Sequence, residues 1–145
     1  FLSCAEDDTL YIPRHVTFPF SVQQQFSQGH GGGLDETVEL SLEMARTKKI
    51  PLTEEMLLEM WSQPKFFETL QVMGPNDAMH QYFDVVFDIL LPIWEEAKDY
   101  FMSQGGYNRR GPAFLMERLL TAVFLNKEHF FGSQKIQEIP FIVYR

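Results

Sequence analysis

The sequence predicts a mixed α/β fold that is dominated by helices and contains a few short strands. Four segments carry apolar residues at three- and four-residue steps together with helix-capping residues. Short runs of β-branched and aromatic residues lie beside prolines or glycines, as is typical of strands. Apolar residues make up 45% and charged residues 22% of the 145 positions, which argues against a chain that is disordered throughout.

The first 33 residues are expected to be mainly extended or looped, and they contain two candidate regular elements. Residues 10–12 form a candidate strand, because Pro13 stops a ladder of hydrogen bonds and favours extended geometry before it. Residues 21–28 form a short helical candidate. Residues 29–33, four glycines around His30, are expected to be a flexible break, since so many glycines cost too much backbone entropy inside a regular element.

Two helices are predicted next. Asp35 is expected to cap a helix that runs to about residue 48, with Val38, Leu42 and Ala45 on one face. Thr53 is expected to cap the second helix, whose first turn carries two glutamates that suit the positive end of the helix dipole.

The third predicted helix has the strongest periodicity. It starts at residue 76 or 77 and runs to about residue 102, before a pair of glycines. Pro92 is expected to kink it, and Phe87 is expected to be buried. The inward face is predicted from apolar residues at three- and four-residue steps: Met79, Phe83, Val86, Leu90, Ile93, Ala97 and Tyr100.

A fourth helix is predicted from residue 111 to about residue 126, because Pro112 suits the first helical position. Residues 69–73 and 139–144 are expected to be strands, the latter at an edge because of Pro140. Three short strands do not complete a sheet. We therefore expect residues 1–145 to be a single domain or part of a larger one.

Composition and charge restrict the function. The formal net charge of −8 argues against binding to nucleic acid or to an anionic membrane surface. Cys4 is the only cysteine, which excludes an internal disulfide framework and a cysteine-rich zinc site. The longest apolar stretch, residues 85–94, is too short to span a bilayer, and no signal peptide is visible. We expect a cytoplasmic protein, with peripheral contact to a membrane left open.

Several polar motifs favour structural interpretations. His30 and the glycines after it resemble the oxyanion-hole loop of esterases, but a Gly-x-Ser-x-Gly nucleophile elbow is missing. Asp84 and Asp88 are four residues apart and could share a cation, although a solvated helix face is the preferred interpretation. The acidic triplet at residues 6–8 loosely resembles the Asp-x-Asp element with which nucleotide-sugar enzymes hold a divalent ion. We predict no specific set of metal ligands.

The densest polar group lies around the start of the fourth helix and comprises Tyr107, Asn108, Arg109, Arg110, Glu117 and Arg118. An arginine side chain presents a planar fork that suits phosphate or carboxylate. On residue chemistry alone we favour an Arg–Glu pair that holds a loop on a helix. A binding site for an anion is the alternative.

Three stretches of the chain follow one another in a recognisable order: residues 83–90 (FDVVFDIL), 107–120 (YNRRGPAFLMERLL) and 135–140 (KIQEIP). Together they resemble the C-terminal part of a bacterial family, long known only as a domain of unknown function, that occurs in capsular-polysaccharide and exopolysaccharide glycosyltransferases. This chain departs from the family at Ala113, where the family has glycine, and at Thr69, where it has asparagine. The family's upstream His-Tyr-Arg-Arg-type motif has no counterpart here, so the resemblance implies an incomplete fragment.

The resemblance implies the C-terminal portion of an A-type, Rossmann-like glycosyltransferase fold. Its partners would be a nucleotide-sugar donor and a glycan acceptor, and Mg²⁺ or Mn²⁺ would be compatible with its chemistry. Glu117 would be the base or would position the acceptor, while Arg109 and Arg110 would offset the charge of the diphosphate. Tyr107 would stack on a sugar or base, and the remaining polar residues, Asn108 and Arg118, would help to bind substrate.

The competing interpretation is a non-catalytic helical module that binds a protein. Exposed parts of the helices rich in Phe and Met would then form the contact surface. A concave polar site that joins Glu117, Arg110 and Tyr107 would favour the enzyme. A flat apolar patch, with these three residues dispersed, would favour the binding module.

Overall fold

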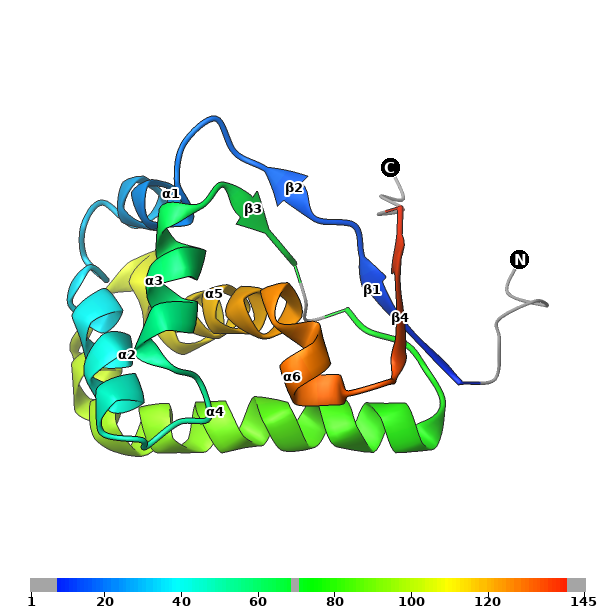
Figure 1. Ribbon diagram of the computed structural model, residues 1–145. Helices are drawn as coiled ribbons and strands as arrows, with labels where there is room; N and C mark the ends of the chain where they lie inside the picture. Colours follow the sequence, from blue (N-terminus) through cyan, green and yellow to red (C-terminus); the bar gives the residue numbers. More distant parts are fainter. Residues whose placement is uncertain (1–7, 69–70, 141–145) are drawn as a thin grey trace.

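Helix α4 (Asn76–Ser103) is the longest described element, and the other described helices and strands lie on one side of it (Figure 1). The computed structural model describes residues 8–68 and 71–140. These residues form a helix-dominated mixed α/β fold with a few short strands, as the sequence predicts. The other elements, in chain order, are β1 (Thr9–Pro13), β2 (Val16–Thr17), α1 (Val22–Gly29), α2 (Glu36–Arg46), α3 (Glu54–Ser62), β3 (Lys65–Phe66), the 3-10 helix η1 (Gly106–Arg110), α5 (Gly111–Leu125), α6 (Lys127–Phe131) and β4 (Lys135–Ile139).

Side-chain caps mark the starts of two of the predicted helices. The Ser21 hydroxyl accepts a hydrogen bond from the Gln24 backbone N–H, and the Gln24 side-chain oxygen accepts one from the Ser21 backbone N–H, which makes a capping box for α1. The Thr53 hydroxyl accepts from the Met56 N–H at the start of α3. Asp35 precedes α2 but makes no side-chain cap, because its backbone is already helical and its carboxylate accepts from the Ser27 hydroxyl instead.

Helix α5 lies at the centre of the core. It contacts α3 and β3 on one side and α4 on another, and Figure 1 shows it between them. A helix enclosed in this way buries apolar side chains around most of its circumference rather than along one stripe. Its buried residues include Leu115, Leu119, Leu120 and Val123, each fully enclosed.

The inward face of α4 differs from the predicted one. Phe83 and Phe87 are exposed, and the buried residues are Ala78, Tyr82, Val86, Ile89, Ile93, Ala97 and Phe101. The prediction was wrong for these two phenylalanines because α4 carries apolar residues on two faces, and periodicity alone does not say which face meets the core. Helix α4 continues through Pro92 without ending.

The strands form two small ladders. Strand β1 is parallel to β4, with Thr9 opposite Lys135 and Pro13 opposite Ile139, and β2 is antiparallel to β3. On the other side of β1, Met73 makes a single antiparallel bridge to Tyr11. The strand predicted at residues 10–12 is therefore confirmed.

The other two strand predictions need correction. Of residues 69–73, positions 69 and 70 lie outside the described residues, and only Met73 pairs with another strand. The C-terminal strand begins at Lys135 rather than at Ile139, and residues 141–145 lie outside the described part. Residues 135–139 are polar on average, so their composition gives no local strand signal. They form a strand because they pair in register with Thr9 to Pro13 of β1.

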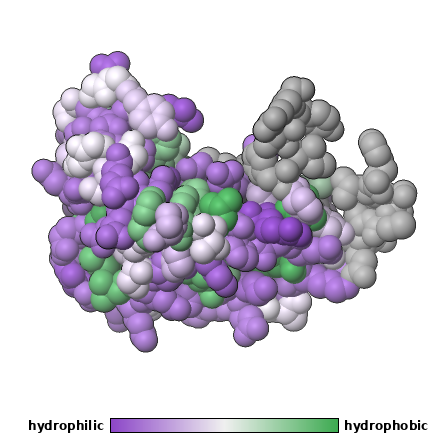
Figure 2. All heavy atoms as spheres, turned by 90° about the horizontal axis from the view of Figure 1, so that it is seen from above, coloured by the Kyte–Doolittle hydropathy of each residue, from purple (hydrophilic) through white to green (hydrophobic). Residues whose placement is uncertain are grey.

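The surface opposite α4 is mostly hydrophilic. Figure 2 views the molecule from above and shows apolar areas that are small and separated by hydrophilic ones. In the ranges that the structure describes, no helix combines the length and the apolar composition that a bilayer crossing requires.

Candidate functional site

The six residues singled out in the sequence lie on two consecutive elements. The 3-10 helix η1 contains Tyr107, Asn108, Arg109 and Arg110, and it leads directly into α5. The second turn of α5 contains Glu117 and Arg118. Gly106 adopts a positive φ of 55°, which lets the chain turn sharply after the end of α4. This turn brings the polar side chains of η1 to the N-terminal end of α5.

Phe114, in the first turn of α5, contacts three of the surrounding side chains. The Tyr107 ring centroid lies 4.7 Å from that of Phe114, and the Arg110 guanidinium lies 5.2 Å from the same centroid. The His30 ring centroid lies 4.5 Å from that of Phe114, and the His30 ring stacks on Tyr107 with an interplanar angle of 17°. An apolar ring thus fixes the positions of an arginine, a tyrosine and a histidine.

The glycine-rich loop between α1 and α2 is held against η1. The Asn108 side chain donates to the His30 carbonyl at 3.2 Å, and the Tyr100 hydroxyl donates to the Gly33 carbonyl at 2.7 Å. A Cβ at Gly33 would lie 2.5 Å from the Asn108 amide nitrogen. Glycine at this position therefore allows Asn108 to approach the loop.

Arg118 is buried, with only 5% of its side chain exposed. It donates to the Phe114 carbonyl at 3.0 Å and to the Gln25 amide oxygen at 2.6 Å. Its guanidinium lies over the rings of Phe26 and Phe66, at 5.2 and 4.6 Å. Arg118 thus joins α1 and β3 to α5, and it is placed to position Glu117 rather than to contact a substrate itself.

Glu117 combines partial burial with nearby charges of both signs. Its side chain is 25% exposed, and its carboxylate accepts from Arg118 at 3.2 Å. Burial raises the pKa of Glu117 above its ordinary value, and the negative charge of Glu68 acts in the same direction. Arg118 and Arg110 lower this pKa, but burial dominates. A carboxyl with a raised pKa at the surface of a fold is a candidate for proton transfer.

The structure separates the paired arginines. Arg109 donates from Nε to the Gln104 carbonyl and thereby binds the end of α4. Arg110 lies over Phe114 and is close enough to Glu117 to affect its pKa. Tyr107, Arg110, Glu117 and Arg118 therefore come together, whereas Asn108 and Arg109 are engaged by the backbone of neighbouring segments.

Sequence reasoning missed three participants in this site. His30 is buried, and burial lowers its pKa, as does the charge of Arg118. In the described part of the chain, His30 Nδ1 and Arg118 Nε are buried without a hydrogen-bond partner. Gln25 accepts a hydrogen bond from Arg118, and the negative charge of Glu68 raises the pKa of Glu117. The only local signal for any of them was the position of His30 directly before the glycine run.

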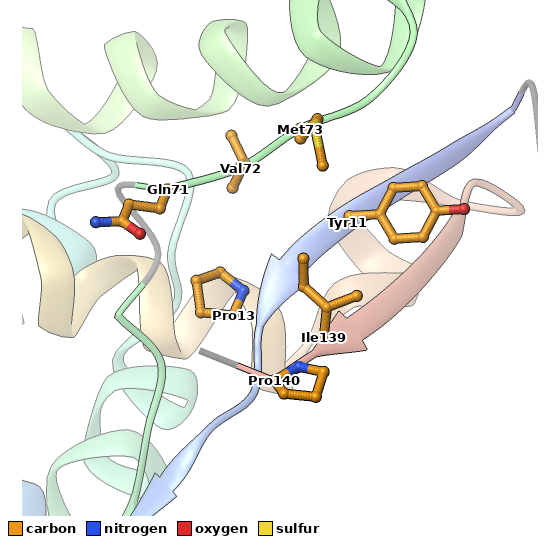
Figure 3. A pocket seen from close by; sticks show the side chains of 7 residues that line it. All are labelled: Tyr11, Pro13, Gln71, Val72, Met73, Ile139 and Pro140. Atoms are coloured by element: carbon orange, nitrogen blue, oxygen red, sulfur yellow. The ribbon is translucent and has the colours of Figure 1, made fainter. Parts of the chain in front are cut away.

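A separate cavity of about 270 Å³ lies at the carboxyl ends of β1 and β4. Figure 3 shows that the side chains around it come from these two strand ends and from the segment that leads to α4. The lining is mostly apolar, with the Gln71 amide as a polar group, and it comprises Tyr11, Pro13, Gln71, Val72, Met73, Ile139 and Pro140.

Near the same strand ends, His15 and Glu138 form a close pair. One carboxylate oxygen of Glu138 lies 2.7 Å from His15 Nδ1 and accepts from the His15 backbone N–H at 2.8 Å. These hydrogen bonds hold the pKa of Glu138 below its ordinary value, although partial burial acts against them. The pair attaches the end of β4 to the chain that follows β1.

The acidic pair on α4 lies on a solvated helix face. Asp84 and Asp88 are exposed, and within the described ranges no three His, Cys, Asp or Glu side chains gather where they could hold one ion. Glu6 and Asp7 of the acidic triplet lie outside the described residues.

Neither a protein-family model nor a curated protein nor a solved structure matches this chain.

Proposed function

We propose that this chain carries the proton-accepting part of a glycosyltransferase that moves a sugar from a nucleotide diphosphate to a hydroxyl of a glycan. The observation that carries the proposal is Glu117: a half-buried carboxyl with a raised pKa, held by a buried arginine and close enough to Arg110 for that positive charge to act on it. The resemblance of residues 107–120 to the polysaccharide glycosyltransferase family supports the same assignment.

In this reaction Glu117 accepts the proton of the acceptor hydroxyl. The hydroxyl oxygen then forms a bond to the anomeric carbon of the sugar, while the bond from that carbon to the diphosphate oxygen breaks. The raised pKa of Glu117 makes its carboxylate a stronger base than an ordinary surface glutamate. The leaving diphosphate carries negative charge, which Arg110 and Arg109, both exposed, can offset.

Tyr107 supplies a further binding group. Tyr107 is 60% exposed, and contacts with His30 and Phe114 hold its ring in place. An exposed, fixed aromatic ring suits stacking on a sugar or a nucleobase.

The small parallel ladder is compatible with a larger α/β domain of the A-type, Rossmann-like glycosyltransferase class. Parallel strands need a long crossover connection and are usually covered by helices on their faces. Within residues 8–68 and 71–140, all the helices lie in the connection between β1 and β4. Such an enzyme would work in the cytoplasm, at the periphery of the membrane where polysaccharide is built.

The test measures release of nucleoside diphosphate from a panel of nucleotide sugars, with and without oligosaccharide acceptors. Glu117→Gln keeps the shape and hydrogen bonding of the side chain but removes the proton acceptor. We expect turnover to fall by about 10²–10⁴-fold, with a melting temperature close to that of the wild type.

Glu59→Gln is the matched control, because Glu59 is an exposed glutamate on α3. It should leave turnover unchanged. A Glu117→Gln protein that is fully active but less stable would show that Glu117 only anchors Arg118, and the proposal would then be abandoned.

A further inference from the structure

The outer side of α4 carries a row of large apolar side chains that the fold leaves exposed. Phe83, Phe87, Leu91 and Trp94 are exposed by 45%, 49%, 54% and 39%. Their exposed fractions show that no described element covers this row. We call these four residues the α4 stripe.

The spacing of the four residues makes the stripe continuous. Steps of four, four and three residues place them within an arc of about 80° at about 100° per residue. They extend over about 16 Å at 1.5 Å per residue. The rings of Phe83 and Phe87 lie 6.4 Å apart. A single exposed apolar residue is ordinary, but a contiguous row on one helix indicates a surface that binds something.

One edge of the stripe is acidic. Asp84, Asp88 and Glu95 follow it along α4, and all three are exposed. Among the residues that the structure describes, these carboxylates make no ion pair. The surface therefore combines an apolar seam with a row of three carboxylates beside it, and the exposed Lys98 lies one turn beyond Trp94.

We infer that the α4 stripe docks an amphipathic helix of a protein partner whose apolar face is bordered on one edge by lysine or arginine. The regular steps of three and four residues suit the side chains of a second helix, which interlock at the same spacing. The basic edge would lie against Asp84, Asp88 and Glu95, where opposite charges fix the orientation of the partner.

The acidic edge also decides against two other occupants. Helices that lie on anionic membranes carry lysine and arginine beside the apolar face, whereas α4 carries carboxylates there. If two copies of α4 packed antiparallel about a two-fold axis, the acidic edges would face each other and repel.

The inference is independent of the function proposed for Glu117, because the stripe lies on α4 and Glu117 lies on α5. Its test uses two labelled helical peptides of about 18 residues with the same apolar seam. One peptide carries lysine along one edge, and the other carries glutamate at the same positions. Binding is followed by fluorescence anisotropy.

We expect the wild-type protein to bind the lysine peptide and not the glutamate peptide. Phe83→Ser with Phe87→Ser should weaken binding by about tenfold or more. Asp84→Lys with Asp88→Lys should reverse the preference between the two peptides. Leu58→Ser is the matched control, because Leu58 is 50% exposed on α3, and it should change nothing.

Four results would overturn the inference. They are equal binding of both peptides, no binding of either, binding that survives the double serine substitution, and a stripe-dependent attachment to anionic lipid vesicles. Analytical ultracentrifugation adds one more criterion: a dimer that the double serine substitution abolishes would identify a second copy as the occupant instead. All substituted positions are exposed, so melting temperatures should match that of the wild type and exclude misfolding as the cause.

Discussion

Arg118 donates a hydrogen bond to the carboxylate of its neighbour Glu117 at 3.2 Å, and the two side chains differ sharply in exposure. Arg118 is buried among aromatic rings and has other fixed partners, whereas Glu117 reaches the surface. The arginine therefore holds the carboxylate without neutralising it fully, and burial still raises the pKa of Glu117. Four predictions follow from this arrangement and from the rest of the fold.

The pKa of Glu117 should respond in opposite directions to two nearby charges. Arg110→Gln removes a positive charge that lowers this pKa, so the pKa should rise. Glu68→Gln removes a negative charge that raises it, so the pKa should fall. Carboxyl chemical shifts of ¹³C-labelled glutamate, followed by NMR as a function of pH, measure both changes. Shifts of the same sign in the two variants would contradict the assigned charges.

Arg118→Met should destabilise the protein strongly. The substitution leaves the Phe114 carbonyl and the Gln25 side chain without their donor and removes a guanidinium stacked on two rings. We expect a loss of about 2–4 kcal/mol in the free energy of unfolding, measured with urea. Arg109→Met is the control, since Arg109 is exposed and makes one hydrogen bond, and its effect should be much smaller.

Two neighbouring residues of α4 should differ greatly in their contribution to stability. Ile89 is fully buried, and Ile89→Ala should cost about 2–5 kcal/mol. Phe87 is exposed on the α4 stripe, and Phe87→Ala should change the free energy of unfolding by less than about 0.5 kcal/mol. Chemical denaturation of both variants checks the orientation of α4, and the reverse order of the two losses would show that α4 is rotated.

The pair of His15 and Glu138 should make stability depend on pH in the acidic range. The folded protein holds the pKa of Glu138 below its ordinary value of 4.5. This contribution to stability is therefore present above that value and is lost as the pH falls through the lower folded pKa. Thermal unfolding between about pH 6 and pH 3 should show a smaller acid-induced loss for Glu138→Gln than for the wild type. An identical loss in both proteins would exclude the contribution.

The helices are the part of the fold that local sequence determines. Ser21 and Thr53 start α1 and α3 with side-chain hydrogen bonds, and α4 ends at Ser103, just before the predicted pair of glycines. Such signals act between residues three or four positions apart, so they can be read without knowing the rest of the structure. The helix-dominated fold class follows from them.

The strands depended on partners far away in the chain. Lys135–Ile139 pairs with β1 more than a hundred residues earlier, and its start is fixed by that register rather than by its own composition. The same holds for Met73, which joins β1 by a single bridge. β-structure is stabilised by cross-strand neighbours, which a local pattern does not contain.

The candidate site also has features that the local sequence indicates and features that depend on tertiary packing. The sequence by itself placed Tyr107, Arg110, Glu117 and Arg118 close together, because they lie on adjacent turns around the start of one helix. Only the tertiary structure decided that Arg118 is buried, that Glu117 reaches the surface, and that His30 joins them from another loop. It also decided which apolar face of α4 meets the core. Burial depends on which elements pack together, and this sets both the pKa of Glu117 and the exposure of Phe87.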